Sequence, residues 1–262
     1  MDGQVALTGQ ARLAEMLRES CSAVALTGAG ISVPSGIPDF RTPGTGLWEN
    51  VDPMEVAHID AFHADPARFW SFYRPRFAEL RSKAPNRAHA ALAELERRGL
   101  IQAVITQNID RLHRAAGSKR VIEVHGSIET SSCTSCEASF SMASLDGLFG
   151  DDGVAECSAC CGKVKPDVVL FGEFLPEAAM EEATALCEAA DLVICVGSSL
   201  EIYPVAGLPS AALNRGARLA IITQGLTPYD PDATVKLEGD VIEELEAVLA
   251  ELPAPSASQP SL

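Results

Sequence analysis

Three stretches that read as buried strands, at 103–106, 121–124 and 192–196, each end in residues that could do chemistry. The residues that follow them are Gln107, Asn108, Asp110, His125, Gly197, Ser198 and Ser199. Because the carboxyl ends of parallel strands lie at one edge of a sheet, we expect these side chains to converge. A histidine suits general-base work because its ordinary pKa is close to neutral pH. A single histidine after a strand is more often structural, and this convergence is what favours a catalytic His125.

The turn Gly28-Ala29-Gly30, directly after an expected strand at 24–26, could hold a phosphate group. Glycines lack a Cβ, so the backbone can turn sharply and come close to a ligand. The dinucleotide fingerprint is incomplete, because Val33 stands where a third glycine is usual. The following run Pro38-Asp39-Phe40-Arg41 places an acid, an aromatic ring and a base in a row, which strengthens the prediction of a binding site.

Two Cys-x-x-Cys pairs, separated by 20 residues, indicate a tetrahedral zinc site. The expected ligands are Cys133, Cys136, Cys157 and Cys160. We prefer Cys160 to Cys161 because it repeats the two-residue gap of the first pair. Four thiolates leave no open position for water, so the metal should be structural; the alternative is a pair of redox dithiols. Cys21, Cys187 and Cys195 are expected to be buried.

The composition excludes some functions. The chain has 262 residues and a net charge of −16, which argues against nucleic acid as a direct ligand. No apolar run is long enough to span a membrane, and Met1-Asp2-Gly3-Gln4 lacks the basic start of a signal peptide. We therefore expect a cytoplasmic protein, in which cysteines are thiols or metal ligands.

Strand-like segments alternate with helix-like ones, which predicts an α/β fold with a parallel sheet and helices on both faces. Expected helices lie at 8–20, 88–98, 176–190 and 240–252, with Thr8 as a cap of the first. We expect a further strand within 165–173, and 219–222 is the last clear strand. Half of the aromatic residues fall in 42–84, which indicates a loop and a small helical module. The Pro/Ser/Ala-rich end, 253–262, is expected to be disordered.

These motifs together resemble the sirtuin family of NAD-dependent protein lysine deacylases. The resemblance spans about 24–252 and rests on Gly28-Ala29-Gly30-Ile31-Ser32, Gly36-Ile37-Pro38-Asp39-Phe40-Arg41, Thr106-Gln107-Asn108-Ile109-Asp110-Arg111-Leu112-His113, His125-Gly126, the four cysteines, Phe171-Gly172-Glu173 and Gly197-Ser198-Ser199-Leu200. It implies a Rossmann-like NAD-binding domain formed by 1–41, 86–126 and 168–252. A cofactor-binding loop and helical module (42–85) and a zinc module (127–167) would be inserted in it.

The resemblance also implies roles for single residues. The acyl-lysine amide oxygen attacks the nicotinamide ribose, and His125 acts as the general base on a ribose hydroxyl. Asn108 orients water and the ribose, and Asp110 accepts a hydrogen bond from the nicotinamide amide. The full set of implied NAD contacts is Gly28, Ala29, Gly30, Ser32, Ile37, Asp39, Phe40, Arg41, Gln107, Asn108, Asp110, Gly197, Ser198, Ser199, Thr223, Gln224 and Gly225. The family usually has Asn where Thr223 stands, so this adenosine contact departs from the pattern.

The partner implied is an acylated lysine segment of another protein. It would add to the strand edge that carries Val168, Val169, Phe171 and Gly172. Tyr73 and Arg76, three residues apart on an expected helix, match a pair with which the desuccinylase branch holds an acidic acyl group. An ordinary helix in the aromatic module is the other reading, and deacetylation is preferred to desuccinylation or demalonylation.

The predicted function is NAD-dependent deacetylation of protein lysines, with transfer of the acyl group to ADP-ribose and release of nicotinamide. One rival is mono-ADP-ribosyl transfer, which cleaves NAD in the same way. The other is a non-catalytic NAD-sensing adaptor that binds partners through its zinc module. His125, Asn108 and Asp110 are all present, which argues against a dead enzyme.

Overall fold

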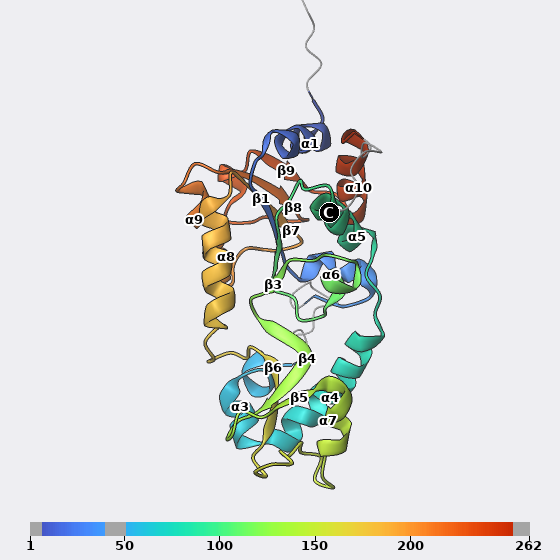
Figure 1. Cartoon of the computed structure of the whole chain (residues 1–262), viewed down its shortest axis with the longest axis vertical. Coiled ribbons are helices and arrows are strands. Elements are labelled where there is room, and N and C mark those ends of the chain that lie inside the picture. Colours follow the sequence, from blue (N-terminus) through green and yellow to red (C-terminus); the bar gives the residue numbers. More distant parts are fainter. Residues whose placement is uncertain (1–6, 40–50, 254–262) are drawn as a thin grey trace, which may run out of the picture.

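The computed structural model of the protein describes residues 7–39 and 51–253. Its largest element is a parallel sheet of six strands in the order β3-β2-β1-β7-β8-β9 (Figure 1). The strands are β1 (Ala23–Thr27), β2 (Val104–Thr106), β3 (Val121–Glu123), β7 (Leu192–Val196), β8 (Arg218–Ile222) and β9 (Val235–Leu237). The expected parallel α/β sheet is confirmed.

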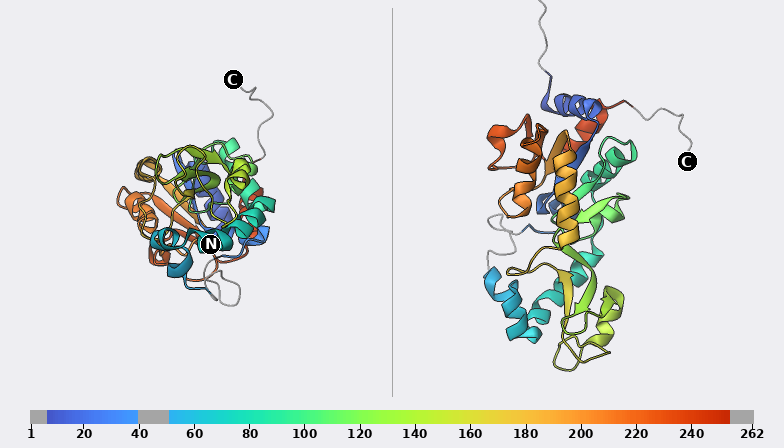
Figure 2. Two further views of the ribbon diagram at one scale, coloured as in Figure 1. Left: turned by 90° about the horizontal axis from the view of Figure 1, so that it is seen from below. Right: turned by 60° about the vertical axis from the view of Figure 1, so that its left-hand side comes forward.

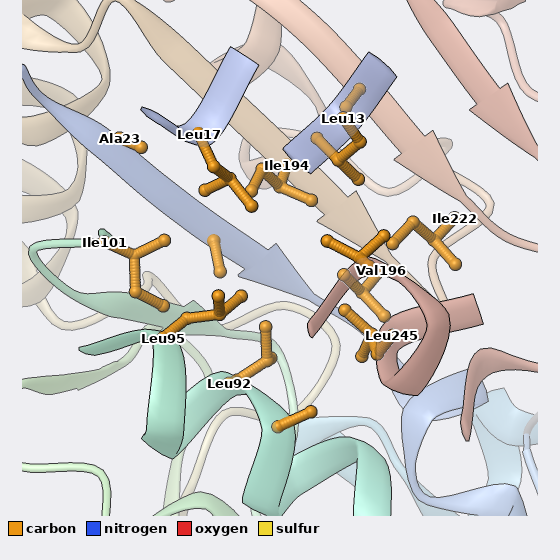
Figure 3. Close-up of a cluster of buried hydrophobic side chains, with 14 of the residues drawn as sticks. Leu13, Leu17, Ala23, Leu92, Leu95, Ile101, Ile194, Val196, Ile222 and Leu245 are labelled. Atoms are coloured by element: carbon orange, nitrogen blue, oxygen red, sulfur yellow. The ribbon is translucent and has the colours of Figure 1, made fainter. Parts of the chain in front are cut away.

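Helices cover both faces of this sheet, as expected from the alternation of strands and helices. On one face lie α1 (Gly9–Glu19), α5 (Arg87–Arg97) and α10 (Val241–Glu251). Figure 3 shows how their leucines, among them Leu13, Leu92 and Leu245, meet Ile194 and Val196 of the central strand β7. The other face is covered by α8 (Glu177–Ala189) and α9 (Leu208–Leu213). Thr8 caps α1 by accepting a hydrogen bond from the N–H of Ala11, as predicted.

A second part of the molecule extends from the edge of the parallel sheet where its strands end (Figures 1 and 2). It contains a three-stranded antiparallel sheet with the order β5-β4-β6. The strands are β4 (Gly126–Cys133), β5 (Ser139–Ser141) and β6 (Val164–Val168), and the helices beside them are α2 (Pro53–Val56), α3 (Ile59–Ala64), α4 (Pro66–Ser82) and α7 (Met142–Leu145).

The aromatic helices and the antiparallel sheet share one hydrophobic core. Trp70 of α4 is fully buried, donates a hydrogen bond from Nε1 to the carbonyl oxygen of Val164, and lies edge-on against Phe149. Phe62 and Phe77 line the same core together with Ile128 of β4. The expected aromatic module is therefore present, but its core is completed by residues of the cysteine-bearing segment.

Three expectations need correction. The strand expected within 165–173 is only β6, which ends at Val168 and pairs antiparallel with β4. The last strand of the parallel sheet is β9, because the short Val-Lys-Leu segment at 235–237 pairs with β8. Cys21 is exposed rather than buried, since it lies in the connection between α1 and β1. No helix in the ranges 7–39 and 51–253 is long and apolar enough to cross a membrane.

Candidate functional site

The site lies where the strand order reverses, between β1 and β7. Chain order runs outward from β1 in one direction and from β7 in the other, and such a switch point is where open α/β sheets bind ligands. The loops after these two strands touch: the N–H of Gly30 donates to the carbonyl oxygen of Gly197 at 2.8 Å. A Cβ on Gly28 would lie 2.8 Å from the Cβ of Ser198, and one on Gly197, where φ is 61°, would lie 2.3 Å from the nitrogen of Ile31. Glycine is thus required for one loop to pack on the other.

The turn after β1 continues as two short 3-10 turns, Ala29–Ile31 and Val33–Ser35, rather than as a long helix. Within the described ranges the backbone N–H groups of Ala29 and Ser199 have no hydrogen-bond partner. Both belong to the two loops that meet at the switch point, and free N–H groups in such loops are donors for a phosphate. The donor set therefore fits the anionic centre of a dinucleotide.

Ser32 is the centre of a buried polar cluster. Its hydroxyl donates to Oδ2 of Asp110 at 2.6 Å and accepts from Nδ2 of Asn108 at 3.1 Å. Nδ2 of Asn108 also donates to the carbonyl oxygen of Gly28, and the other oxygen of Asp110 accepts from the N–H of Leu112. The amide nitrogen of Asn108 is therefore held inside the protein, and its Oδ1 has no donor in the described part of the chain.

Two histidines that the sequence interpretation did not single out lie behind this cluster. His89 Nε2 is 3.4 Å from the Ser32 hydroxyl, and its Nδ1 accepts from the N–H of Asn86, so His89 carries its proton on Nε2. His113 Nε2 is 2.9 Å from the hydroxyl of Thr27. Burial lowers the pKa of His89 to about 4 and that of His113 to about 3, so both rings are neutral at pH 7.

Thr27 connects His113 to the strand ends. Its hydroxyl donates to the hydroxyl of Thr106 at 2.8 Å, and Thr106 also accepts from the backbone N–H of Asn108. Hydrogen bonds thus link His113 through Thr27 to Thr106, whose hydroxyl accepts both from Thr27 and from the backbone N–H of Asn108. His89 comes from α5 and belongs to no quoted motif, whereas His113, from α6 (Leu112–Ala115), ends the Thr106–His113 run but was given no role there. Only their tertiary contacts show what the two histidines do.

His125 lies at the joint between the two sheets, after β3 and immediately before β4. Its Nδ1 is 3.0 Å from the carbonyl oxygen of Gln107. A carbonyl can only accept, so Nδ1 carries the proton and Nε2 is left with a free lone pair. Burial lowers the pKa of His125, with partial opposition from the Gln107 carbonyl. Gly126 next to it must be glycine, since φ is +76° and a Cβ would lie 2.0 Å from the carbonyl oxygen of Asp167.

The remaining expected cofactor contacts follow β2, β7 and β8. Nε2 of Gln107 donates to the hydroxyl of Ser198 at 3.0 Å and so links two of these strand ends.

Thr223 is buried, while Gln224 and Gly225 are exposed on the loop that follows β8. Lys236 of β9 fixes this loop by donating to the carbonyl oxygen of Gly225 at 2.8 Å, and it pairs with Asp230. Ile37 and Asp39 are half-buried after the glycine turn, and Phe40 and Arg41 lie outside the described residues.

The four expected cysteine ligands come together at the far end of the molecule. The sulfur atoms of Cys133, Cys136, Cys157 and Cys160 all lie within 4.8 Å of one another, whereas Cys161 is exposed and outside the cluster. The pairs Cys133–Cys160 and Cys136–Cys157 are 3.5 and 3.6 Å apart, close to the sulfur separation of about 3.8 Å in a tetrahedral zinc–thiolate site. Gly162 leaves room for this packing, because a Cβ there would lie 2.8 Å from Sγ of Cys133. The cluster fits one zinc ion with no open position.

The expected substrate segment uses most of its own backbone groups internally. The N–H of Val169 donates to the carbonyl oxygen of His125, Val168 pairs with Gly126, and Phe171 pairs through both its N–H and its C=O with Ala57 and Ile59. Gly172 follows in a left-handed conformation beside His58. In the described structure the N–H groups of Gly172 and Phe174 have no partner, so the free edge begins at Gly172.

Tyr73 and Arg76 both lie on α4, but they have different surroundings. The Tyr73 ring packs between Phe69 and Phe77, and burial raises its pKa to about 12. The Arg76 guanidinium lies 3.6 Å from the centre of the Phe72 ring and donates to the Phe72 carbonyl oxygen. Arg76 lines a cavity of about 550 Å³ together with Val51, Asp52, Glu55, Val56, Arg68, Ser71 and Phe72. Tyr73 is not part of this lining.

Comparisons with known proteins agree on one family. A profile of the Sir2 family matches residues 28–204. The NAD-dependent protein deacetylase of Thermotoga maritima is 44% identical over 237 residues, which cover 90% of this chain and 96% of that protein. The NAD-dependent protein deacylase 2 of Archaeoglobus fulgidus is 43% identical and covers 92% of this chain and 95% of its own.

Solved structures match equally well. A Sir2 structure with a deacetylated p53 peptide and 3′-O-acetyl-ADP-ribose has a TM-score of 0.87 and 43% identity, and the match covers 92% of this chain and 97% of that chain. A Sir2 structure bound to an acetylated peptide has a TM-score of 0.84 and 42% identity, with the same coverage.

Proposed function

The chain belongs to the Sir2 family, and on that premise we propose that it is an NAD-dependent protein lysine deacetylase. The observation that carries the proposal is His125, whose Nδ1 is tied to the Gln107 carbonyl so that Nε2 is free as a base. NAD supplies a cleavable nicotinamide–ribose bond and an ADP-ribose acceptor for the acyl group. The residues of this chain bind it, orient it and move protons around it.

His125 accepts a proton from a ribose hydroxyl through Nε2. Its lowered pKa keeps the ring neutral, and therefore basic, at pH 7. Asn108 offers Oδ1 to a water or a ribose hydroxyl, because Nδ2 is already held by Gly28 and Ser32. Asp110, fixed by Ser32 and by the N–H of Leu112, accepts a hydrogen bond from the nicotinamide amide.

The two glycine-rich loops hold the diphosphate. Free N–H groups of Ala29 and Ser199 are its donors, and Gly28, Gly30 and Gly197 let the loops approach each other. Ile37 and Phe40 are proposed to line the nicotinamide pocket, Arg41 to contact phosphate and ribose, and Asp39 to contact the cofactor. Thr223, Gln224 and Gly225 would hold the adenosine side. A threonine hydroxyl at 223 takes the place of the amide usual in the family.

The substrate is an acylated lysine segment of another protein that binds in extended form beside Phe171 and Gly172. Relatives solved with acetylated peptides support this class of partner. We further propose an NAD domain (1–41, 86–126, 168–252) and a second part in which the helical module (42–85) and the zinc module (127–167) share one core. None of the eight cysteines forms a disulfide, which suits a protein of the reducing cytoplasm.

Nicotinamide release tests this function against its rivals. The purified protein is incubated with NAD, with and without an acetyl-lysine peptide, and nicotinamide is quantified. A deacetylase releases it only when the peptide is present. Release with labelling of a protein by ADP-ribose, in the absence of any deacylated peptide, would identify a mono-ADP-ribosyltransferase. No release under either condition would identify an NAD-binding adaptor.

A second activity, removal of succinyl or malonyl groups, is favoured by Arg76. Within the described ranges this guanidinium has no ion pair, and it lines the cavity of about 550 Å³. A carboxylate-tipped acyl chain that entered the cavity would gain a charge-assisted hydrogen bond. Arg68 lines the same cavity but is already paired with Glu55 at 2.7 Å.

We expect Arg76→Met to lower kcat/KM for a succinyl-lysine peptide by at least about tenfold, since a hydrogen bond to a charged group contributes about 1.5–3 kcal/mol. Activity on acetyl-lysine should change little, and Arg68→Met is the matched control with little effect on either peptide. If the wild type is inactive on succinyl-lysine, this second activity is excluded, and Arg76 has only a structural place on α4.

A further inference from the structure

We propose that the ring of Phe174 forms a subsite for a large apolar side chain that flanks the acylated lysine of the substrate. This inference rests on the proposed deacylase function and adds a preference for substrate sequence to it. Phe174 was not among the residues that the sequence interpretation assigned to the site.

Phe174 is the most exposed large apolar side chain in the described part of the protein, at 99%. The chain on either side of it is anchored: Leu170 is buried in the core of the antiparallel part, and Leu175 packs against the core under α8. The segment thus turns inward twice and presents Phe174 outward between the two anchors. Phe171, 44% exposed, is the other exposed ring of this segment.

The loop under Phe174 is rigidly braced. The carboxylate of Glu173 accepts from the N–H of Leu170 at 2.8 Å and pairs with Lys165 at 3.1 Å, and Lys165 also donates to the carbonyl oxygen of Val168. The N–H of Glu173 donates back to Leu170. A ring presented on such a fixed backbone loses little conformational freedom when it binds a partner.

An extended substrate segment is the occupant that the surroundings of Phe174 favour. The N–H groups of Gly172 and Phe174 lack partners among the described residues, so both are available to the backbone of an extended peptide. The one carboxylate of the loop, on Glu173, is already paired with Lys165. The loop therefore offers no unpaired carboxylate to a basic side chain of the substrate, although the whole chain carries a net charge of −16.

The test uses acetyl-lysine peptides that differ only in the residues flanking the lysine, which are Gly, Ser, Leu, Phe or Arg. At saturating NAD we expect the Leu and Phe peptides to have KM values about tenfold lower than the Gly peptide, with similar kcat. Phe174→Ala should remove this difference and leave the Gly peptide unchanged. Leu226→Ala, which removes another exposed apolar side chain from the loop after β8, is the matched control and should keep the preference.

The subsite is excluded if the wild type shows no preference among the peptides or prefers the Arg peptide. It is also excluded if Phe174→Ala raises the KM of all peptides by the same factor. Peptide binding measured by fluorescence anisotropy without NAD separates this inference from the proposed function. Lack of turnover with a retained, Phe174-dependent preference for Leu would contradict the deacetylase and support the subsite. Turnover that does not depend on the residues flanking the lysine would support the deacetylase and contradict the subsite.

Discussion

At the scale of single residues, one hydrogen bond sets the chemistry of His125. The carbonyl oxygen of Gln107 fixes the proton on Nδ1, and burial keeps the ring neutral by lowering its pKa. Asn108 and Asp110 are fixed in the same way by Ser32, which shares its hydroxyl between them. Each group that would touch the ligand is thus oriented by a partner that lies deeper in the protein.

His125→Ala should lower kcat for deacetylation by about 10²-fold or more, because removing a general base typically costs this much. Binding of NAD, measured by calorimetry, should be retained, since the phosphate donors belong to other loops. The rate of the wild type should fall only as pH drops below the ordinary histidine range, because the pKa of His125 is lowered. Near-normal turnover of the variant would exclude His125 as the base.

The lowered pKa values of His89 and His113 predict that the free energy of unfolding falls as the pH becomes acidic. Their pKa values are lowered from 6.5 to about 4 and about 3, so above pH 6.5 neither folded nor unfolded chain gains a proton. Between pH 6.5 and about 4 only the unfolded chain binds these protons, and each histidine then costs about 1.4 kcal/mol of unfolding free energy per pH unit.

Urea unfolding at pH 7, 6 and 5 measures this slope. His113→Gln should flatten it, whereas His63→Gln, which changes an exposed histidine, should leave it as in the wild type. All three proteins share the cysteine cluster, so its own pH dependence cancels in the comparison. Equal slopes in all three would refute the assignment.

The sequence indicated the residues that face the ligand better than those that hold them. Asn108, Asp110 and His125 follow strands, and strand ends can be recognised from short apolar runs. His89 and His113 reach the site from helices, and their role depends on contacts with Ser32 and Thr27 that no local pattern encodes.

At the scale of elements, the cysteine cluster is formed by the last residue of β4 and by the turns outside β4 and β6. Cys133 closes β4 opposite Val164 of β6, and the turns after Cys133, Cys157 and Cys160 donate backbone N–H groups to the sulfur atoms. Cys161 is exposed with φ of 61°, and its thiol is outside the cluster.

Cys160→Ser should therefore release zinc and lower thermal stability, because ligand binding supplies folding free energy in such small metal modules. Cys161→Ser should keep one zinc per chain and melt like the wild type. Metal content is measured by mass spectrometry of the purified variants. Loss of zinc in Cys161→Ser and its retention in Cys160→Ser would reverse the assignment.

Long apolar strands were predictable and short or mixed ones were not. The strands β1 and β7 are fully buried, and their continuous apolar runs show this directly. In contrast, β9 has three residues with Lys236 in the middle, and β6 contains Pro166 and alternates in burial. Their pairing is set by the neighbouring strand rather than by their own composition.

At the scale of the whole molecule, the two parts meet at the site. The chain passes directly from β3 of the parallel sheet to β4 of the antiparallel one (Figure 1). His125 lies in this connection, and its carbonyl oxygen accepts a hydrogen bond from the N–H of Val169. The aromatic helices and the cysteine-bearing strands share one core, although 42–85 and 127–167 are far apart in sequence. The sequence indicated two separate modules because a shared core between distant segments leaves no local signal.

Zinc removal should therefore destabilise both the antiparallel sheet and the helices that share its core. After chelation, we expect hydrogen exchange to accelerate in α4 and in β4 to β6, because Trp70 is bonded to Val164 and packed in the same core. Strands β1, β7 and β8 should stay protected, since their core is separate. Faster exchange confined to 133–163 would show that the helices hold without the metal.

The most direct test of the proposed function follows the acyl group itself. The protein, NAD and an acetyl-lysine peptide are mixed, and all products are quantified by mass spectrometry. We predict deacetylated peptide, nicotinamide and O-acetyl-ADP-ribose in equal amounts, and none of the three when NAD is left out. Deacetylated peptide with free acetate and intact NAD, or nicotinamide without deacetylated peptide, would contradict the account.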